Sequence, residues 1–214
     1  MHEGGFFNPD SLAAVNKALD DALSDESAQG LIITGEGKIF SQGLDLEYLS
    51  TLDLTQFRDF VEECMAMIGR LLCYPLPLVN VVNGHAFGLG AMIALAGDYK
   101  VMRQDRGYIC LPEIDLGMIF PPSMNALVCD RLPGTIRRDM MLTGKRVAAE
   151  EAVAHQIVDA SGELGGLLEQ GKQLAVPMMG KPRDIIARIK RGMNLDVVTV
   201  IEAGASEPAN WNGS

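Results

Sequence analysis

Short, unbroken apolar runs alternate with stretches of helical periodicity along this chain. The runs predict buried strands at 30–34, 78–82, 98–102, 108–111 and 157–159. Strands that alternate with helices in this way are typical of an α/β fold.

The spacing of apolar residues predicts helices in the segments between these strands. Leu12, Val15, Leu19 and Leu23 fall on one face of a first helix, behind the cap residues at 8–11. A second apolar stripe runs from Phe57 to Leu72 and should end before Pro75. The segment 88–96 is apolar on all sides, which predicts a buried helix. Further helices are expected from 126 onward, with breaks near 133 and 143, and then at 148–156, 163–176 and 182–194.

Two glycine-containing turns follow the first two predicted strands. One contains Ser41-Gln42-Gly43-Leu44-Asp45-Leu46, and the other runs from Asn83 through Gly88-Leu89-Gly90. Turns that lead into helices leave backbone N–H groups unpaired and directed outward. Two such turns facing one point would stabilise a developing negative oxygen, as in chemistry on a carbonyl or thioester.

Composition limits the classes of protein to consider. A chain of 214 residues that is 48% hydrophobic can form one full core. A net charge of −10 argues against nucleic acid as a partner. The four cysteines are far apart and the three histidines are scattered, which favours reduced thiols and no metal site. No apolar run reaches transmembrane length, so no membrane partner is expected.

The order of four motifs resembles the enoyl-CoA hydratase/isomerase (crotonase) superfamily. The motifs are Phe40-Ser41-Gln42-Gly43-Leu44-Asp45-Leu46, the second glycine turn, Pro112-Glu113-Ile114-Asp115-Leu116-Gly117, and Leu142-Thr143-Gly144 with Ala149-Glu150-Glu151-Ala152. The segments 102–107 and 137–143 are most similar to those of the short Δ3,Δ2-enoyl-CoA isomerases. The resemblance implies a crotonase-like ββα spiral core over 1–143, followed by a C-terminal helical region over 144–214.

The resemblance also implies an oxyanion hole formed by the backbone N–H groups of Leu44 and Leu89, with Glu113 as the acid–base group. Hydratases of the family use two glutamates, and the position of the first is occupied here by Met92. Moving a double bond needs only one group that takes a proton and returns it elsewhere. The resemblance therefore favours a Δ3,Δ2-enoyl-CoA isomerase acting on acyl-CoA in fatty acid breakdown. A hydratase-like or other enolate reaction, or a non-catalytic acyl-CoA-binding homologue, stays open.

CoA is expected to bind as part of the substrate, with no separate cofactor. By resemblance it should lie against Gln42 and Leu46, and Lys38 could reach a phosphate. Met92, Ile119 and Phe120 are candidates for an apolar pocket wall that would raise the pKa of Glu113. Met124, Met140 and Met141 fit either the core or an acyl pocket.

Other polar residues have a simpler interpretation. His85 is expected in a structural or surface role, although it could be a base. Asp45 is expected to cap or brace the first turn and Asp98 to be a hydrogen-bonded structural residue, whereas Asp115 could assist Glu113.

By analogy with the family, the chain is expected to form a homotrimer or hexamer. A cytoplasmic location is expected because the sequence shows no peroxisomal signal of the Ser-Lys-Leu type. The chain also departs from the family pattern at three places. Residues 1–4 resemble the end of the family's first strand, Gln156 stands where a glycine is usual, and the sequence beyond 160 matches poorly. The tail from 204 is expected to be loose.

Overall fold

The computed structural model describes residues 5–204. Its largest sheet has four parallel strands in the order β2 (Leu31–Thr34), β5 (Leu78–Val82), β7 (Tyr99–Arg103) and β9 (Ala160–Gly162). All five residues of β5 are buried, as its unbroken apolar sequence predicts for the centre of a parallel sheet.

A smaller parallel sheet lies beside the first, with the order β3 (Ile39–Ser41), β6 (His85–Phe87) and β8 (Ile109–Cys110). A separate pair joins β1 (Phe6–Phe7) to β4 (Gly43–Leu44). The chain therefore passes from the large sheet to the small sheet and then into a helix, three times in succession. This is the predicted ββα spiral.

The helices of the spiral carry the predicted apolar faces. They include α1 (Pro9–Ser24), α3 (Leu54–Leu72) and the completely buried α4 (Leu89–Leu95). The described segment from 122 to 154 contains α5 (Pro122–Arg131), α6 (Gly134–Thr143) and α7 (Ala149–Ala154). A single turn of helix, α2 (Leu46–Leu49), follows β4. α5 starts four residues before the predicted position because Pro122 occupies its first turn, where the missing N–H has no cost.

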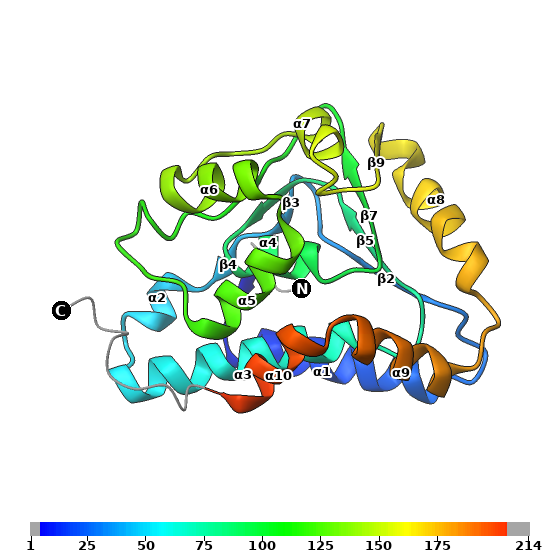
Figure 1. Cartoon of the computed structure of the whole chain (residues 1–214), viewed down its shortest axis with the longest axis horizontal. Coiled ribbons are helices and arrows are strands. Elements are labelled where there is room, and N and C mark those ends of the chain that lie inside the picture. Colours follow the sequence, from blue (N-terminus) through cyan, green and yellow to red (C-terminus); the bar gives the residue numbers. More distant parts are fainter. Residues whose placement is uncertain (1–4, 205–214) are drawn as a thin grey trace.

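The C-terminal segment encloses the spiral from two sides. α8 (Leu164–Ala175) packs on β5 and β7 and is followed by a 3-10 turn at Val176–Met178, whereas α9 (Arg183–Met193) leads into α10 (Leu195–Ala203), which packs on α3 and α5 (Figure 1). Within 5–204, no helix combines the length and apolar character needed to span a membrane. The predictions for 1–4 and for the tail beyond 204 lie outside the described residues.

One sequence-based prediction in this segment is wrong, and one helix was not predicted. Residues 157–159 form a turn, and the strand that pairs with β7 is β9, which starts at Ala160. Ile157 and Val158 are buried because they pack into the core from this turn, so their apolar character did not indicate a strand. The helix predicted at 182–194 is confirmed as α9, whereas α10, which begins after the break at Asn194, was not predicted.

A buried ion pair attaches α9 to the large sheet. The ammonium of Lys190 lies 2.5 Å from a carboxylate oxygen of Asp98 and donates to the carbonyl of Leu76 at 2.8 Å. The same Asp98 carboxylate accepts a hydrogen bond from the backbone N–H of Leu78 at the start of β5. This confirms the structural role expected for Asp98, and it explains how a mainly polar helix is fixed against the core.

Gln156 has a backbone φ of +58°, in the left-handed region that favours glycine. It follows α7, and the N–H of Ile157 bonds to the carbonyl of Ala152 across it, as in a Schellman turn. Replacing Gln156 by Gly should raise the free energy of unfolding by about 0.5–1 kcal/mol, because the strain outweighs the extra chain entropy. Urea unfolding would measure this, and a lower stability would contradict it. Gln173→Gly on the exposed face of α8 is the control and should lose a similar amount.

Candidate active site

The first glycine turn is pressed against the second. Gly43 has a φ of +81°, and a Cβ atom there would lie 2.5 Å from the carbonyl oxygen of Phe87 and 3.2 Å from the nitrogen of Leu89. Only glycine allows this approach. The hydroxyl of Ser41 accepts from the N–H of Gly43 and donates to the carbonyl of Gly5, which fixes the turn on its other side. The two predicted oxyanion donors, Leu44 and Leu89, therefore belong to turns in direct contact.

The second turn places Leu89 at the start of α4. Gly88 is the N-cap, with φ +50° and ψ −120°, and no side chain caps the helix. The backbone N–H of Leu89 is thus one of the first-turn donors that have no partner within the helix. A helix start also carries a partial positive charge, which favours a nearby negative oxygen.

Glu113 lies next to these turns, just after β8 and Pro112. One of its carboxylate oxygens lies 3.5 Å from the position that a Cβ on Gly88 would occupy. The other is buried and has no hydrogen-bond partner among the described residues. Its loop is closed by a hydrogen bond from the N–H of Met118 to the Glu113 carbonyl at 2.8 Å. The position of the carboxyl is therefore fixed by the backbone, while one oxygen stays available for reaction.

Burial determines the acidity of this carboxyl. Glu113 is 6% exposed, and desolvation raises its pKa to about 7. No charged partner opposes this shift, and a hydrogen bond from the residue's own backbone N–H offsets it only in part. A carboxyl with a pKa near neutrality can both take up and return a proton, which suits general acid–base chemistry.

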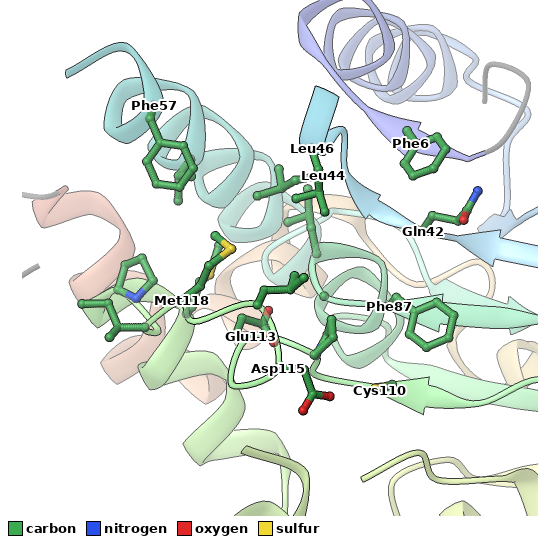
Figure 2. Close-up of a pocket in the computed structure, with 18 of the residues that line it drawn as sticks. Phe6, Gln42, Leu44, Leu46, Phe57, Phe87, Cys110, Glu113, Asp115 and Met118 are labelled. Atoms are coloured by element: carbon green, nitrogen blue, oxygen red, sulfur yellow. The ribbon is translucent and has the colours of Figure 1, made fainter. Parts of the chain in front are cut away.

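The turns and Glu113 line a cavity of about 300 Å³. Figure 2 shows Glu113 between two contrasting ends: Phe57 and Met118 lie toward one end, and Gln42 and Phe87 toward the other. Arg146 also lines the cavity, with its guanidinium 5.7 Å from the centre of the Phe87 ring. The site therefore offers an apolar end, a central carboxyl and a more polar end.

Most residues predicted from the sequence meet in this cavity. Gln42, Leu44, Leu46, Leu89 and Glu113 all line it. Lys38 does not. It is exposed, and its backbone carbonyl accepts from the N–H of His85 on β6. Its contact with a phosphate stays a prediction.

The predicted apolar wall is partly different from the observed one. Ile119 and Met124 line the cavity, whereas Phe120 packs against the core outside it. Met92 is completely buried in the core and does not line the cavity. Its side chain packs against the core residues that surround α4. Met140 and Met141 also belong to the core and its edge.

The remaining polar candidates occupy supporting positions. Asp45 caps α2 by accepting from two N–H groups, as expected. His85 does not line the cavity, and its ring stacks on that of Phe87. Asp115 lines the rim of the cavity, but its carboxylate points away from Glu113 (Figure 2). Within 5–204, no group of three or more potential ligands is arranged for a metal ion.

Sequence reasoning missed several lining residues. Phe6, Cys110 and Arg146 come from three separate segments, and only the pairing of β1 with β4 and the bridge between Ile109 and Val147 bring them to the cavity. The alternation of side chains along β6 was a usable signal for Phe87, which follows the buried Ala86.

Comparison with known proteins agrees with this architecture. The family model described as Enoyl-CoA hydratase/isomerase matches residues 6–207. Enoyl-CoA delta isomerase 3 of Arabidopsis thaliana is 33% identical, over 96% of this chain and 90% of its own length.

Solved structures of other proteins share the fold of this chain. A probable enoyl-CoA hydratase from Mycobacterium tuberculosis H37Rv is 27% identical with a TM-score of 0.87, covering 95% of this chain and 86% of its own. The human mitochondrial delta3-delta2-enoyl-CoA isomerase is 22% identical with a TM-score of 0.79, covering 92% and 82%, and shows the shared fold. With two glycine turns, a buried glutamate and a family match over nearly its whole length, the chain belongs to the enoyl-CoA hydratase/isomerase family.

Proposed function

We propose that this protein is a Δ3,Δ2-enoyl-CoA isomerase, which moves the double bond of a 3-enoyl-CoA thioester into conjugation with the carbonyl. The proposal rests on the residues at the two positions where hydratases of the family have glutamates. Glu113 is a buried, uncompensated carboxyl in the cavity, and the other position is Met92, enclosed in the core. The likeness to plant enoyl-CoA delta isomerases supports the same choice.

The reaction then needs only groups of this chain. The thioester oxygen accepts hydrogen bonds from the backbone N–H groups of Leu44 and Leu89. Glu113 removes a proton from carbon 2, and the electron pair delocalises onto the oxygen as a dienolate. The same carboxyl returns the proton to carbon 4, so that carbons 2 and 3 become doubly bonded and the thioester carbonyl re-forms. Losing one well-placed oxyanion donor costs about 3–4 kcal/mol in other enzymes, so two donors supply a large part of the catalysis.

The walls of the cavity suit this chemistry. Phe57 and Met118 form an apolar end for the acyl chain, and methionine adapts to chains of different length. The same apolar surroundings exclude water from Glu113, which favours proton return over addition of water. CoA enters as part of the substrate, and the proposal requires no further cofactor.

The activity should depend on pH through Glu113. The base must be deprotonated to remove the carbon-2 proton, and its pKa is raised to about 7 by burial. The value of kcat/KM should therefore be half-maximal near pH 7 and fall about tenfold per pH unit below it. A profile that is flat from pH 5 to pH 8 would show that a different group, with an ordinary carboxyl pKa, is the base.

The direct test of the function is a spectrophotometric assay with two substrates. Purified protein is incubated with 3-hexenoyl-CoA, and the absorbance of the conjugated enoyl thioester is followed. Crotonyl-CoA is tested in parallel for loss of the same absorbance by hydration. The proposal predicts a gain with the first substrate and no change with the second. Hydration of crotonyl-CoA without isomerisation would favour a hydratase, and no reaction with either would contradict the proposal.

A further inference from the structure

Two cavities meet where α3 passes the start of α5. The active-site cavity that contains Glu113 has a smaller neighbour of about 20 Å³, which lies between α3, the start of α5 and α10. Within the described chain, only Val61 of α3 and Pro121, the N-cap of α5, line both cavities. Val61 is 2% exposed, and Pro121 is also buried. These two residues therefore form a partition between the two cavities.

The partition belongs to the apolar end of the active-site cavity. Phe57 and Val61 are four residues apart on α3, so they lie on the same face of the helix, and both line the cavity. Figure 2 shows Phe57 at the end of the cavity opposite Gln42 and Phe87. An acyl chain that extends from Glu113 past Phe57 therefore runs toward Val61.

The second cavity continues this direction behind the partition. Met65, one turn after Val61 on α3, is 1% exposed, and Ile201 of α10 closes the space because α10 packs on both α3 and α5 (Figure 1). The half-buried Arg58 and Glu62 complete much of the remaining wall. A volume of about 20 Å³ holds roughly one water molecule, so it is too small for a chain unless the partition is removed.

The side chain of Val61 is suited to a fixed stop. A β-branched residue in a helix has one strongly preferred rotamer, and the burial of Val61 leaves it no space to turn aside. The ring of Pro121 is equally restricted. Met118, at the same end of the cavity, is flexible and can adapt to the chain along its side. The length of the apolar end is thus set by a rigid pair, while its width is adjustable.

We propose that Val61 determines the longest acyl chain that this enzyme accepts, and that the substrates are short- and medium-chain 3-enoyl-CoA esters. The end of the chain stops at Val61, and the second cavity stays outside the site. Shortening Val61 joins the two cavities and lets the chain continue toward Met65. This inference rests on the proposed function, which places the reacting carbons at Glu113 and the acyl chain at the Phe57 end.

The kinetic test compares 3-hexenoyl-CoA with 3-dodecenoyl-CoA. Each methylene that is buried or refused is worth about fourfold. The kcat/KM of the wild type should be at least about tenfold lower for the longer ester. Val61→Ala, which removes two methyl groups, should raise the ratio of long-chain to short-chain kcat/KM about 15-fold, and Val61→Ile should lower it about fourfold. A wild type that prefers the longer ester would overturn the proposal, as would a ratio that neither variant changes.

Two further variants separate the partition from a general loosening of the core. Val128→Ala makes the same change at a completely buried position of α5 that lines neither cavity, and it should leave the ratio unchanged. Ser123 lines only the second cavity, so Val61→Ala combined with Ser123→Phe should refill the joined space and cancel the gain. A gain that persists in this double variant, or that appears equally in Val128→Ala, would refute the proposal.

A binding measurement separates this inference from the proposed function. Hexanoyl-CoA and dodecanoyl-CoA are saturated and cannot isomerise, and each is titrated calorimetrically into the wild type and the variants. A relative gain of about 15-fold for dodecanoyl-CoA in Val61→Ala, removed again by Ser123→Phe, supports the role of Val61 even if the wild type isomerises neither 3-enoyl ester. An identical affinity ratio in the wild type and both Val61 variants contradicts that role even if the isomerase is active. Because Val61→Ile adds bulk and Val61→Ala removes it, the two variants test the partition in opposite directions.

Discussion

Glu113→Gln is expected to lower kcat for 3-hexenoyl-CoA by about 10³-fold while leaving CoA-ester binding nearly unchanged. The amide has the shape of the carboxyl but cannot take the proton from carbon 2. No other carboxylate is buried in the cavity among the described residues, so nothing can replace it. Single-turnover kinetics together with calorimetric binding of the product would measure both parts of this prediction.

Asp115→Asn is the matched control for this variant. It removes a carboxylate two residues away on the rim of the same cavity, and that carboxylate points away from Glu113. Its kcat should stay within about threefold of the wild type, since rim charges act mainly on association. If Asp115→Asn were as damaging as Glu113→Gln, two carboxylates would share the chemistry, and a hydratase-like mechanism would be the better description.

Asp98→Asn should reduce the free energy of unfolding by about 3–5 kcal/mol, because it leaves the ammonium of Lys190 buried without its counter-ion. Lys190 is 4% exposed, and the Leu76 carbonyl would be its remaining hydrogen-bond partner in the described structure. The asparagine still accepts from the N–H of Leu78, so the variant isolates the charge. Urea denaturation followed by circular dichroism would measure the loss.

Two further variants make this prediction specific. The double variant Asp98→Asn with Lys190→Met removes both charges and should recover most of the stability, as is found when buried pairs are replaced together. Asp21→Asn breaks an exposed pair with Lys17, whose side chains are 63% and 74% exposed, and should cost less than about 1 kcal/mol. A double variant as unstable as Asp98→Asn would mean that packing around Lys190, not its charge, holds α9.

The centre of the spiral was predictable because its central strand is short, continuous and buried. β5 matches the predicted 78–82 residue for residue, and α4 is as completely buried as its sequence indicates. The C-terminal segment was less predictable because its contacts decide its structure. Ile157 and Val158 have the composition of a strand but are buried by a turn, which requires the left-handed backbone of Gln156.

The residues of the candidate site were likewise predictable only in part. Glu113, Leu44 and Leu89 were found because their motifs are local, and each belongs to a turn defined by a few adjacent residues. The opposite wall was not found, because Phe6 and Arg146 reach the cavity only through strand pairing across the chain. Met92 was placed on the pocket wall from its position in the motif, whereas the packing of α4 turns it into the core.

A crystal structure with a bound, unreactive acyl-CoA thioester would show whether the two glycine turns and Glu113 hold the reacting atoms as proposed. The thioester oxygen is expected about 2.7–3.1 Å from the backbone nitrogens of both Leu44 and Leu89. A carboxylate oxygen of Glu113 is expected to reach both carbon 2 and carbon 4, with no second carboxylate in contact with either. A thioester oxygen bound away from these two N–H groups, or the carboxylate of Asp115 beside the reacting carbons, would contradict this arrangement.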